Sequence, residues 1–83
     1  MLHITDVAYL EEYRLWLAFD NGVSGQVDLG GELWGEMFAP LLDRAAFAEV
    51  ALDRELGTIA WKNGADLAPE YLLERLQREE VAA

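Results

Sequence analysis

Two stretches within the first 30 residues alternate apolar and polar positions, which is the pattern of half-buried β-strands. The clearest is 13–19, whose odd-numbered positions are all apolar. Asn21-Gly22 follows it, and this dipeptide favours the positive φ angles of a tight hairpin turn. A moderately apolar segment lies before it at 2–10, and 23–29 alternates after it. The pattern therefore predicts a three-stranded antiparallel meander.

Helical spacing replaces this alternation after Gly30-Gly31, where apolar positions recur at three- and four-residue intervals between 33 and 42. Pro40 limits any helix in this region, because an interior proline removes a hydrogen bond and clashes with the preceding turn. We therefore expect one or two short helical turns around it.

The second half of the chain predicts two more strands and a final helix. Residues 47–52 and 58–61 form the expected strand pair. The helix should run from about Pro69 to Gln77, because proline suits the first helical position and the following leucines form one stripe.

Together these elements predict an α+β fold of order β-β-β-α-β-β-α, with helices packed on one small, mostly antiparallel sheet. We expect a single domain at 1–78 and a flexible C-terminal tail at 79–83, where the apolar pattern stops. The predicted core consists of Leu15, Leu17, Phe19, Val27, Trp61, Leu72 and Leu76.

The charge balance narrows the range of partners. Sixteen acidic and six basic residues give a formal net charge of −10, which repels phosphate backbones and anionic lipid. We therefore expect no direct binding to nucleic acid or to a membrane. The start of the chain has no basic region followed by a long apolar run, and the chain has no cysteine, so we expect a cytoplasmic protein.

Residues that carry chemistry are scarce, and we predict a non-catalytic protein without cofactor or metal. The chain has no cysteine, and its only histidine, His3, lies close to the N-terminus. A zinc site needs several nitrogen or sulfur ligands, which the chain lacks. Carboxylates are abundant, but those in predicted turns accept local backbone hydrogen bonds without any further role.

The most distinctive stretch is 61–70, which reads as a strand end, an Asn-Gly turn, an aspartate and a proline-initiated helix. In a structural interpretation, Asp66 accepts backbone hydrogen bonds before the helix. In a functional interpretation, Trp61 is a stacking anchor and Asp66 a polar contact in a shallow groove. Our candidate partner-binding residues are Trp61, Asn63, Asp66 and Trp34.

Several of these segments resemble the bacterial domain of unknown function 2442 (DUF2442). The resemblance covers most of the chain and rests on four segments: Tyr13 to Gly22, Val27-Asp28-Leu29, Phe47 with Val50, and Trp61 to Glu70. Lys62 stands where the family usually has proline, and Ala68 where it often has serine or aspartate, so the final helix lacks a side-chain N-cap.

The resemblance implies an α+β fold and a bacterial origin, and it brings no catalytic residues. Family members are sometimes fused to a helix-turn-helix domain, an arrangement similar to that of antitoxin-like or regulatory modules. Our leading hypothesis is a protein-interaction or regulatory module, antitoxin-like in one form, with a basic protein as partner. The alternatives are a small-molecule-binding module or minor enzyme using clustered carboxylates, a structural homo-oligomer such as a homodimer, and an acidic mimic of nucleic acid.

Overall fold

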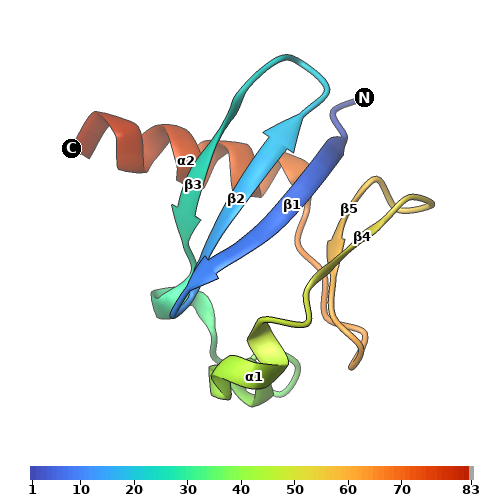
Figure 1. Cartoon of the computed structure of the whole chain (residues 1–83), viewed down its shortest axis with the longest axis vertical. Helices are drawn as coiled ribbons and strands as arrows, with labels where there is room; N and C mark the ends of the chain where they lie inside the picture. Colours follow the sequence, from blue (N-terminus) through green and yellow to red (C-terminus); the bar gives the residue numbers. More distant parts are fainter. Residues whose placement is uncertain (83) are drawn as a thin grey trace.

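Two antiparallel sheets and one long helix make up the computed structural model, which describes residues 1–82 (Figure 1). The first sheet has the order β1-β2-β3, with β1 at Ile4–Glu11, β2 at Arg14–Phe19 and β3 at Ser24–Asp28. The second pairs β4 (Ala51–Asp53) with β5 (Thr58–Ala60). Along the chain, the segment between β3 and β4 contains two 3₁₀ helices, η1 (Gly30–Glu32) and η2 (Ala39–Leu42), and the short α1 (Arg44–Phe47). The chain continues into α2 (Pro69–Ala82).

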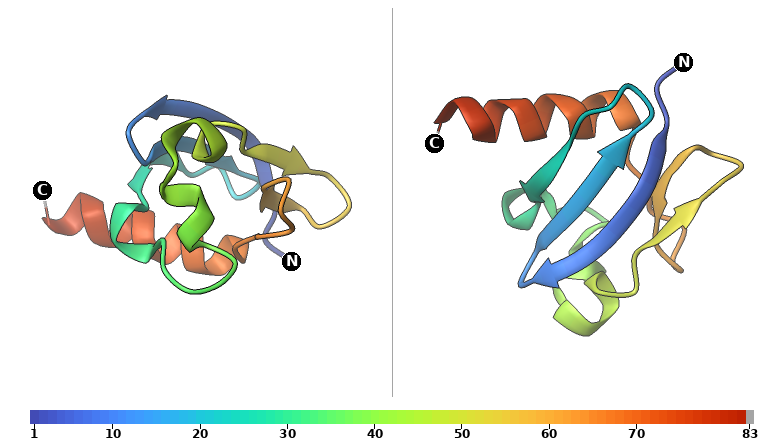
Figure 2. Two further views of the ribbon diagram at one scale, coloured as in Figure 1. Left: turned by 90° about the horizontal axis from the view of Figure 1, so that it is seen from below. Right: turned by 45° about the horizontal axis from the view of Figure 1, so that its top comes forward.

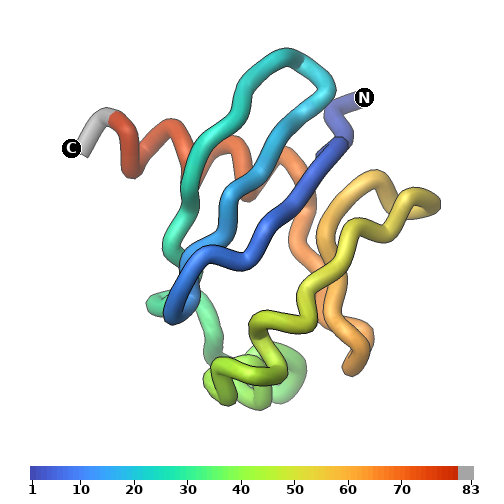
Figure 3. Tube along the Cα trace, viewed as in Figure 1, coloured from blue at the N-terminus to red at the C-terminus, as the bar shows by residue number. Residues whose placement is uncertain are grey.

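The predicted α+β class and element order are confirmed, but the strands form two sheets where we expected one. A backbone hydrogen bond of 2.8 Å, from Ile4 N–H to the Gly57 carbonyl, joins the start of β1 to the β4–β5 turn. The β4–β5 hairpin therefore lies beside the N-terminal end of β1 without continuing its ladder (Figure 3).

The strand predicted at 47–52 is wrong in its first half. Phe47 is the last residue of the helix α1 and is not part of a strand. The segment is helical because the Asp43 side chain caps its start by accepting the Ala45 N–H at 3.1 Å. The Phe47 ring is fully buried and meets the Tyr13 ring edge-on, with 5.4 Å between their centroids. Burial of this ring therefore fixes the turn, and the strand begins only at Ala51.

The core lies between the three-stranded sheet and α2. All seven predicted core residues are buried, and β2 contributes the centre of the core because Leu15 and Leu17 are fully buried on its inner face. Gly25 of β3 allows α2 to approach closely, since a Cβ there would lie 3.3 Å from a methyl group of Leu76. Figures 1 and 2 show α2 on one side of this sheet and no helix of the described chain over the other.

The C-terminal helix is longer than predicted and closes the C-terminal end of β3 at Asp28. We expected it to end near Gln77, with a tail at 79–83, but residues 79–82 are helical and Ala83 lies outside the described residues. The Glu79 carboxylate accepts the Asp28 N–H at 3.1 and 3.2 Å, and Arg75 donates to the Asp28 carbonyl at 2.8 Å. These bonds give the polar end of the helix a structural partner.

Arg75 is the central polar residue of this contact. Its side chain is 17% exposed and forms ion pairs with Glu32 of η1 and with Glu79. Beside it, burial raises the pKa of the Tyr71 phenol, and the Glu32 carboxylate raises it further. The arginine thus ties α2 to both η1 and β3.

The β2–β3 hairpin turns at the predicted place with a longer loop. Phe19 N–H bonds to the Val23 carbonyl at 2.8 Å, so three residues lie between this hydrogen-bonded pair. Within Asn21-Gly22, only the glycine takes a positive φ, at 89°.

A reciprocal clip fixes the N-terminus to this same hairpin. His3 N–H donates to Asp20 Oδ1 at 3.1 Å, and His3 Nδ1 lies 3.0 Å from Asp20 Oδ2. Asp20 N–H donates in turn to the His3 carbonyl at 2.9 Å. The backbone N–H of His3, and then its side chain, hold the pKa of the Asp20 carboxyl below its ordinary value of 3.8.

This clip predicts a specific loss of stability in acid. The pKa of Asp20 is lower in the folded chain than in the unfolded chain. The Asp20 carboxylate therefore stabilises the fold at any pH above the pKa of the unfolded chain. This contribution is lost as the pH falls through the pKa of the folded chain. Between about pH 7 and pH 3, the melting temperature of Asp20→Asn should therefore fall less than that of the wild type. Asp66→Asn, which removes a carboxylate that accepts no hydrogen bond from the described residues, should keep the wild-type slope. Equal slopes for wild type and Asp20→Asn would contradict the account.

Candidate functional site

Trp61 lies in the core and reaches the surface only at its edge. The side chain is 5% exposed, and its indole N–H donates to the Phe47 carbonyl at 2.9 Å. Its ring also packs against the Phe47 ring, with 5.7 Å between centroids, and edge-on against Phe38. The predicted burial of Trp61 is confirmed, and a role as an exposed stacking anchor is not available to it.

Asn63 holds the turn that follows Trp61. Its side-chain oxygen accepts the Ala65 N–H at 3.1 Å, and its side-chain amide donates to the Met37 carbonyl at 2.8 Å. Gly64 takes a positive φ of 93°, which closes the turn. Asn63 therefore connects this turn to the loop between η1 and η2.

Asp66 does not have the capping role expected for it. Its side chain is exposed and accepts no hydrogen bond from the described residues, whereas its backbone forms a bridge with Ala60 of β5. The Ala68 carbonyl accepts the Leu72 N–H at 3.1 Å and so begins α2 without a side-chain cap. The structural interpretation of this segment holds for Asn63 and is wrong for Asp66.

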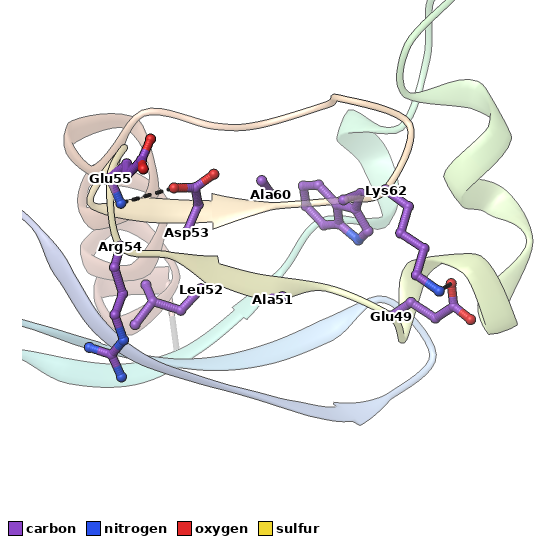
Figure 4. A pocket seen from close by; sticks show the side chains of 9 residues that line it. Glu49, Ala51, Leu52, Asp53, Arg54, Glu55, Ala60 and Lys62 are labelled. Carbon is purple, nitrogen blue, oxygen red and sulfur yellow. Dashed lines mark hydrogen bonds and ion pairs between the residues drawn. The ribbon is translucent and has the colours of Figure 1, made fainter.

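Two cavities flank Trp61. An apolar cavity of about 130 Å³ is lined mainly by Pro40, Leu41, Ala46 and Trp61. An open groove of about 640 Å³ runs along β4 and β5 (Figure 4). The ion pair between Lys62 and Glu49, at 3.4 Å, borders both cavities. Figure 4 shows this pair at one end of the groove and Arg54 at the other.

The loop before η2 presents two large apolar side chains to solvent, and one of them, Met37, lies beside the Asn63-Gly64 turn. Trp34 is 71% exposed and Met37 is 45% exposed. The Met37 methyl group lies beside Gly64, and the Met37 carbonyl receives the Asn63 hydrogen bond. We define the turn surface as this region, made up of Trp34, Met37, Pro40, Lys62, Asn63 and the apolar cavity.

The positive charges of the described chain are mostly neutralised by ion pairs. Arg14, Arg44, Lys62, Arg75 and Arg78 each lie within 4.0 Å of a carboxylate. The excess of acidic over basic residues leaves the net charge of −10 on the surface. Within the described residues, no group of three or more His, Asp or Glu side chains is arranged to hold a metal ion. No helix of the described chain is long and apolar enough to cross a membrane.

Trp16 is a further surface aromatic, and our list of candidates from the sequence omits it. It lies between the buried Leu15 and Leu17 on β2, so its side chain points to the uncovered face of the sheet, where it is half-buried. Its partners across the strands are Ala8 and Gln26. The alternation that predicts Leu15 and Leu17 as core also places Trp16 outside.

Asn63 and Asp66 should respond differently to substitution. Asn63→Ala should lower the free energy of unfolding by about 1–2 kcal/mol, because two hydrogen bonds of the turn are lost. Asp66→Ala should change it by less than about 0.5 kcal/mol, as is usual for an exposed side chain without partners. Urea unfolding monitored by tryptophan fluorescence measures both, and the reverse order would show that Asp66 holds the turn.

Comparison with protein families gives one result that covers most of the chain. The model of the family described as "Protein of unknown function (DUF2442)" matches residues 4–78. Neither the curated proteins nor the solved structures gave a match. The matched region contains β1 through most of α2, including both sheets and the turn surface. The chain therefore belongs to the DUF2442 family of proteins of unknown function.

Proposed function

We propose that this chain is a non-catalytic protein-binding module whose partner contacts the turn surface. The observation that carries the proposal is the exposure of Trp34, at 71% of its surface. A tryptophan contributes a large apolar area when it is buried, and in the free chain Trp34 leaves most of that area in water. Tryptophan is also among the residues that most often dominate binding energies at protein interfaces.

The apolar cavity beside Trp61 supports the same proposal. Its volume of about 130 Å³ is suited to one aliphatic side chain, and its apolar walls offer few hydrogen bonds to a polar ligand. Lys62 at its rim is highly exposed and can move without disturbing the core. A partner side chain inserted here would lie close to Met37, which would combine a pocket and an exposed apolar anchor in one contact.

Charge defines the partner further. With a net charge of −10, the chain favours a basic protein, and it disfavours nucleic acid, anionic membranes and a second copy of itself. The finer form of the proposal is a cytoplasmic, regulatory module, of which an antitoxin-like role is one example. Its binding should weaken as salt rises, because the attraction between the two surfaces is screened.

The test is capture of partners from a lysate of the source organism by three matched baits. Wild type and Leu56→Ala should retain the same proteins, because Leu56 is an exposed leucine in the β4–β5 turn, outside the turn surface. Trp34→Ala should lose them, with a weakening of tenfold or more, in line with about 1.4 kcal/mol or more for an interface tryptophan.

Mass spectrometry of the eluted proteins at low and moderate salt provides the readout. Circular dichroism of each bait confirms that it is folded. If folded Trp34→Ala retains the same proteins as the wild type, the turn surface is not the contact. If the retained proteins are catalytically converted, the non-catalytic assignment is wrong.

A further inference from the structure

The outer edge of β1 carries free backbone groups, as the strand register shows. Phe19 N–H bonds to the Val23 carbonyl, on the side of β3. Along a strand, the backbone groups of every second residue point to the same side, so those of Leu17 and Leu15 also point toward β3. Their partners on β1 are Val7 and Tyr9. The N–H and C=O groups of Val7 and Tyr9 therefore point away from β2, to the outer edge of the sheet.

The ends of some strands in the described chain are closed at single points, whereas Gln26 in the middle of the outer edge of β3 has no such closure. The end of β3 is closed by Glu79 and Arg75 of α2, through the Asp28 N–H and carbonyl. The end of β5 is bridged by Asp66, and the start of β1 by the Gly57 carbonyl. No backbone hydrogen bond of the described residues reaches the outer groups of Val7 and Tyr9.

A side chain takes the place of the missing strand at one of these groups. Asp6 Oδ1 accepts the N–H of Val7 at 2.9 Å, at a position where a neighbouring strand would supply a carbonyl oxygen. The carboxylate protects this N–H in the free chain. It is exposed, so an incoming carbonyl can displace it, and the released carboxylate can then pair with a cation.

The side chains along this edge have an apolar centre and acidic ends. Residues 7–10 are Val-Ala-Tyr-Leu, with Tyr9 and Leu10 exposed. Asp6 precedes this run and Glu11 follows it, at a separation of about 17 Å in an extended strand. Beside it lies the uncovered face of the sheet with Trp16. The edge thus combines hydrogen-bonding groups, apolar area and two carboxylates at a spacing that one extended segment can match.

We propose that the outer edge of β1 binds an extended segment of a partner protein as a fourth strand, with apolar residues at its centre and Lys or Arg at its ends. Main-chain bonds to Val7 and Tyr9 supply the pairing, and Asp6 and Glu11 select the basic ends. A second copy of this chain does not fit this description, because its own edge carries the same acidic ends and each copy has a net charge of −10.

The test uses a synthetic peptide, acetyl-Lys-Val-Thr-Val-Thr-Lys-amide, titrated into ¹⁵N-labelled full-length chain and followed by NMR. The largest shifts should fall on residues 6–11, with a dissociation constant of about 1 mM or tighter. A peptide with glutamate in place of both lysines should bind at least tenfold more weakly. A third peptide is the lysine peptide with methyl groups on the backbone nitrogens of alternate residues, which removes the N–H donors from one of its two edges. It should lose binding when the methylated edge faces β1.

Matched variants of the protein locate the contact. Asp6→Asn should weaken binding of the lysine peptide several-fold and reduce its salt dependence, whereas Asp66→Asn, with the same change of charge elsewhere, should change the affinity less than twofold. Trp34→Ala should bind the peptide like the wild type, which separates this proposal from the one on the turn surface. Absence of binding at several millimolar peptide, shifts outside β1, or equal binding of the glutamate peptide would each overturn the proposal.

Discussion

Burial of the inner face of β2 is the constraint on which the rest of the fold depends. A two-stranded hairpin is at best marginally stable alone, and a three-stranded meander needs a buried apolar face, so both sheets depend on a shared apolar layer. Leu15 and Leu17 supply its centre, and α2 covers them with Leu72 and Leu76. Because β2 lies between β1 and β3, the face that it buries also fixes the orientation of both neighbours.

The same constraint determines what remains outside. Once the inner face is covered by α2, strand alternation leaves Trp16 and Ala8 on a face that no described helix covers. The charged residues near the end of α2 close β3 at Asp28, through Arg75 and Glu79, and no side chain of α2 closes the edge of β1 in this way. Trp34 is excluded from the core by its loop. The exposed aromatic residues and the open edge are thus the features of the surface that packing does not explain, and both proposals rest on them.

Much of the fold follows from local pattern. Alternation in 13–19 and the leucine stripe of the last helix predict the core correctly, because the period of a strand or helix directly places side chains on a face. Sequence reasoning failed where one side chain decides the local structure. Asp43 caps a helical turn within a β-like apolar run, and Glu79 extends a helix whose apolar pattern has already ended. Both effects depend on partners that local pattern does not show.

The candidate site was predicted only in part, for a related reason. Asn63 and Asp66 can each accept a hydrogen bond, but only the amide of Asn63 can also donate, and the acceptor at Met37 lies in a distant part of the chain. Trp61 and Trp34 are the same residue type with opposite exposure, because Trp61 packs against Phe47 and Phe38 whereas Trp34 lies in the loop before η2. Contacts between segments, and not local periodicity, therefore separate structural residues from exposed ones.

The central claim, that the edge of β1 is open in the free chain, is tested most directly by amide hydrogen exchange at single-residue resolution. An open edge requires rapid exchange of the Tyr9 amide, and slow exchange of the Ala8 amide, which faces β2, and of the Asp28 amide, which Glu79 caps. If the Tyr9 amide is protected as strongly as that of Ala8 in dilute solution, the edge is already covered and the claim is wrong.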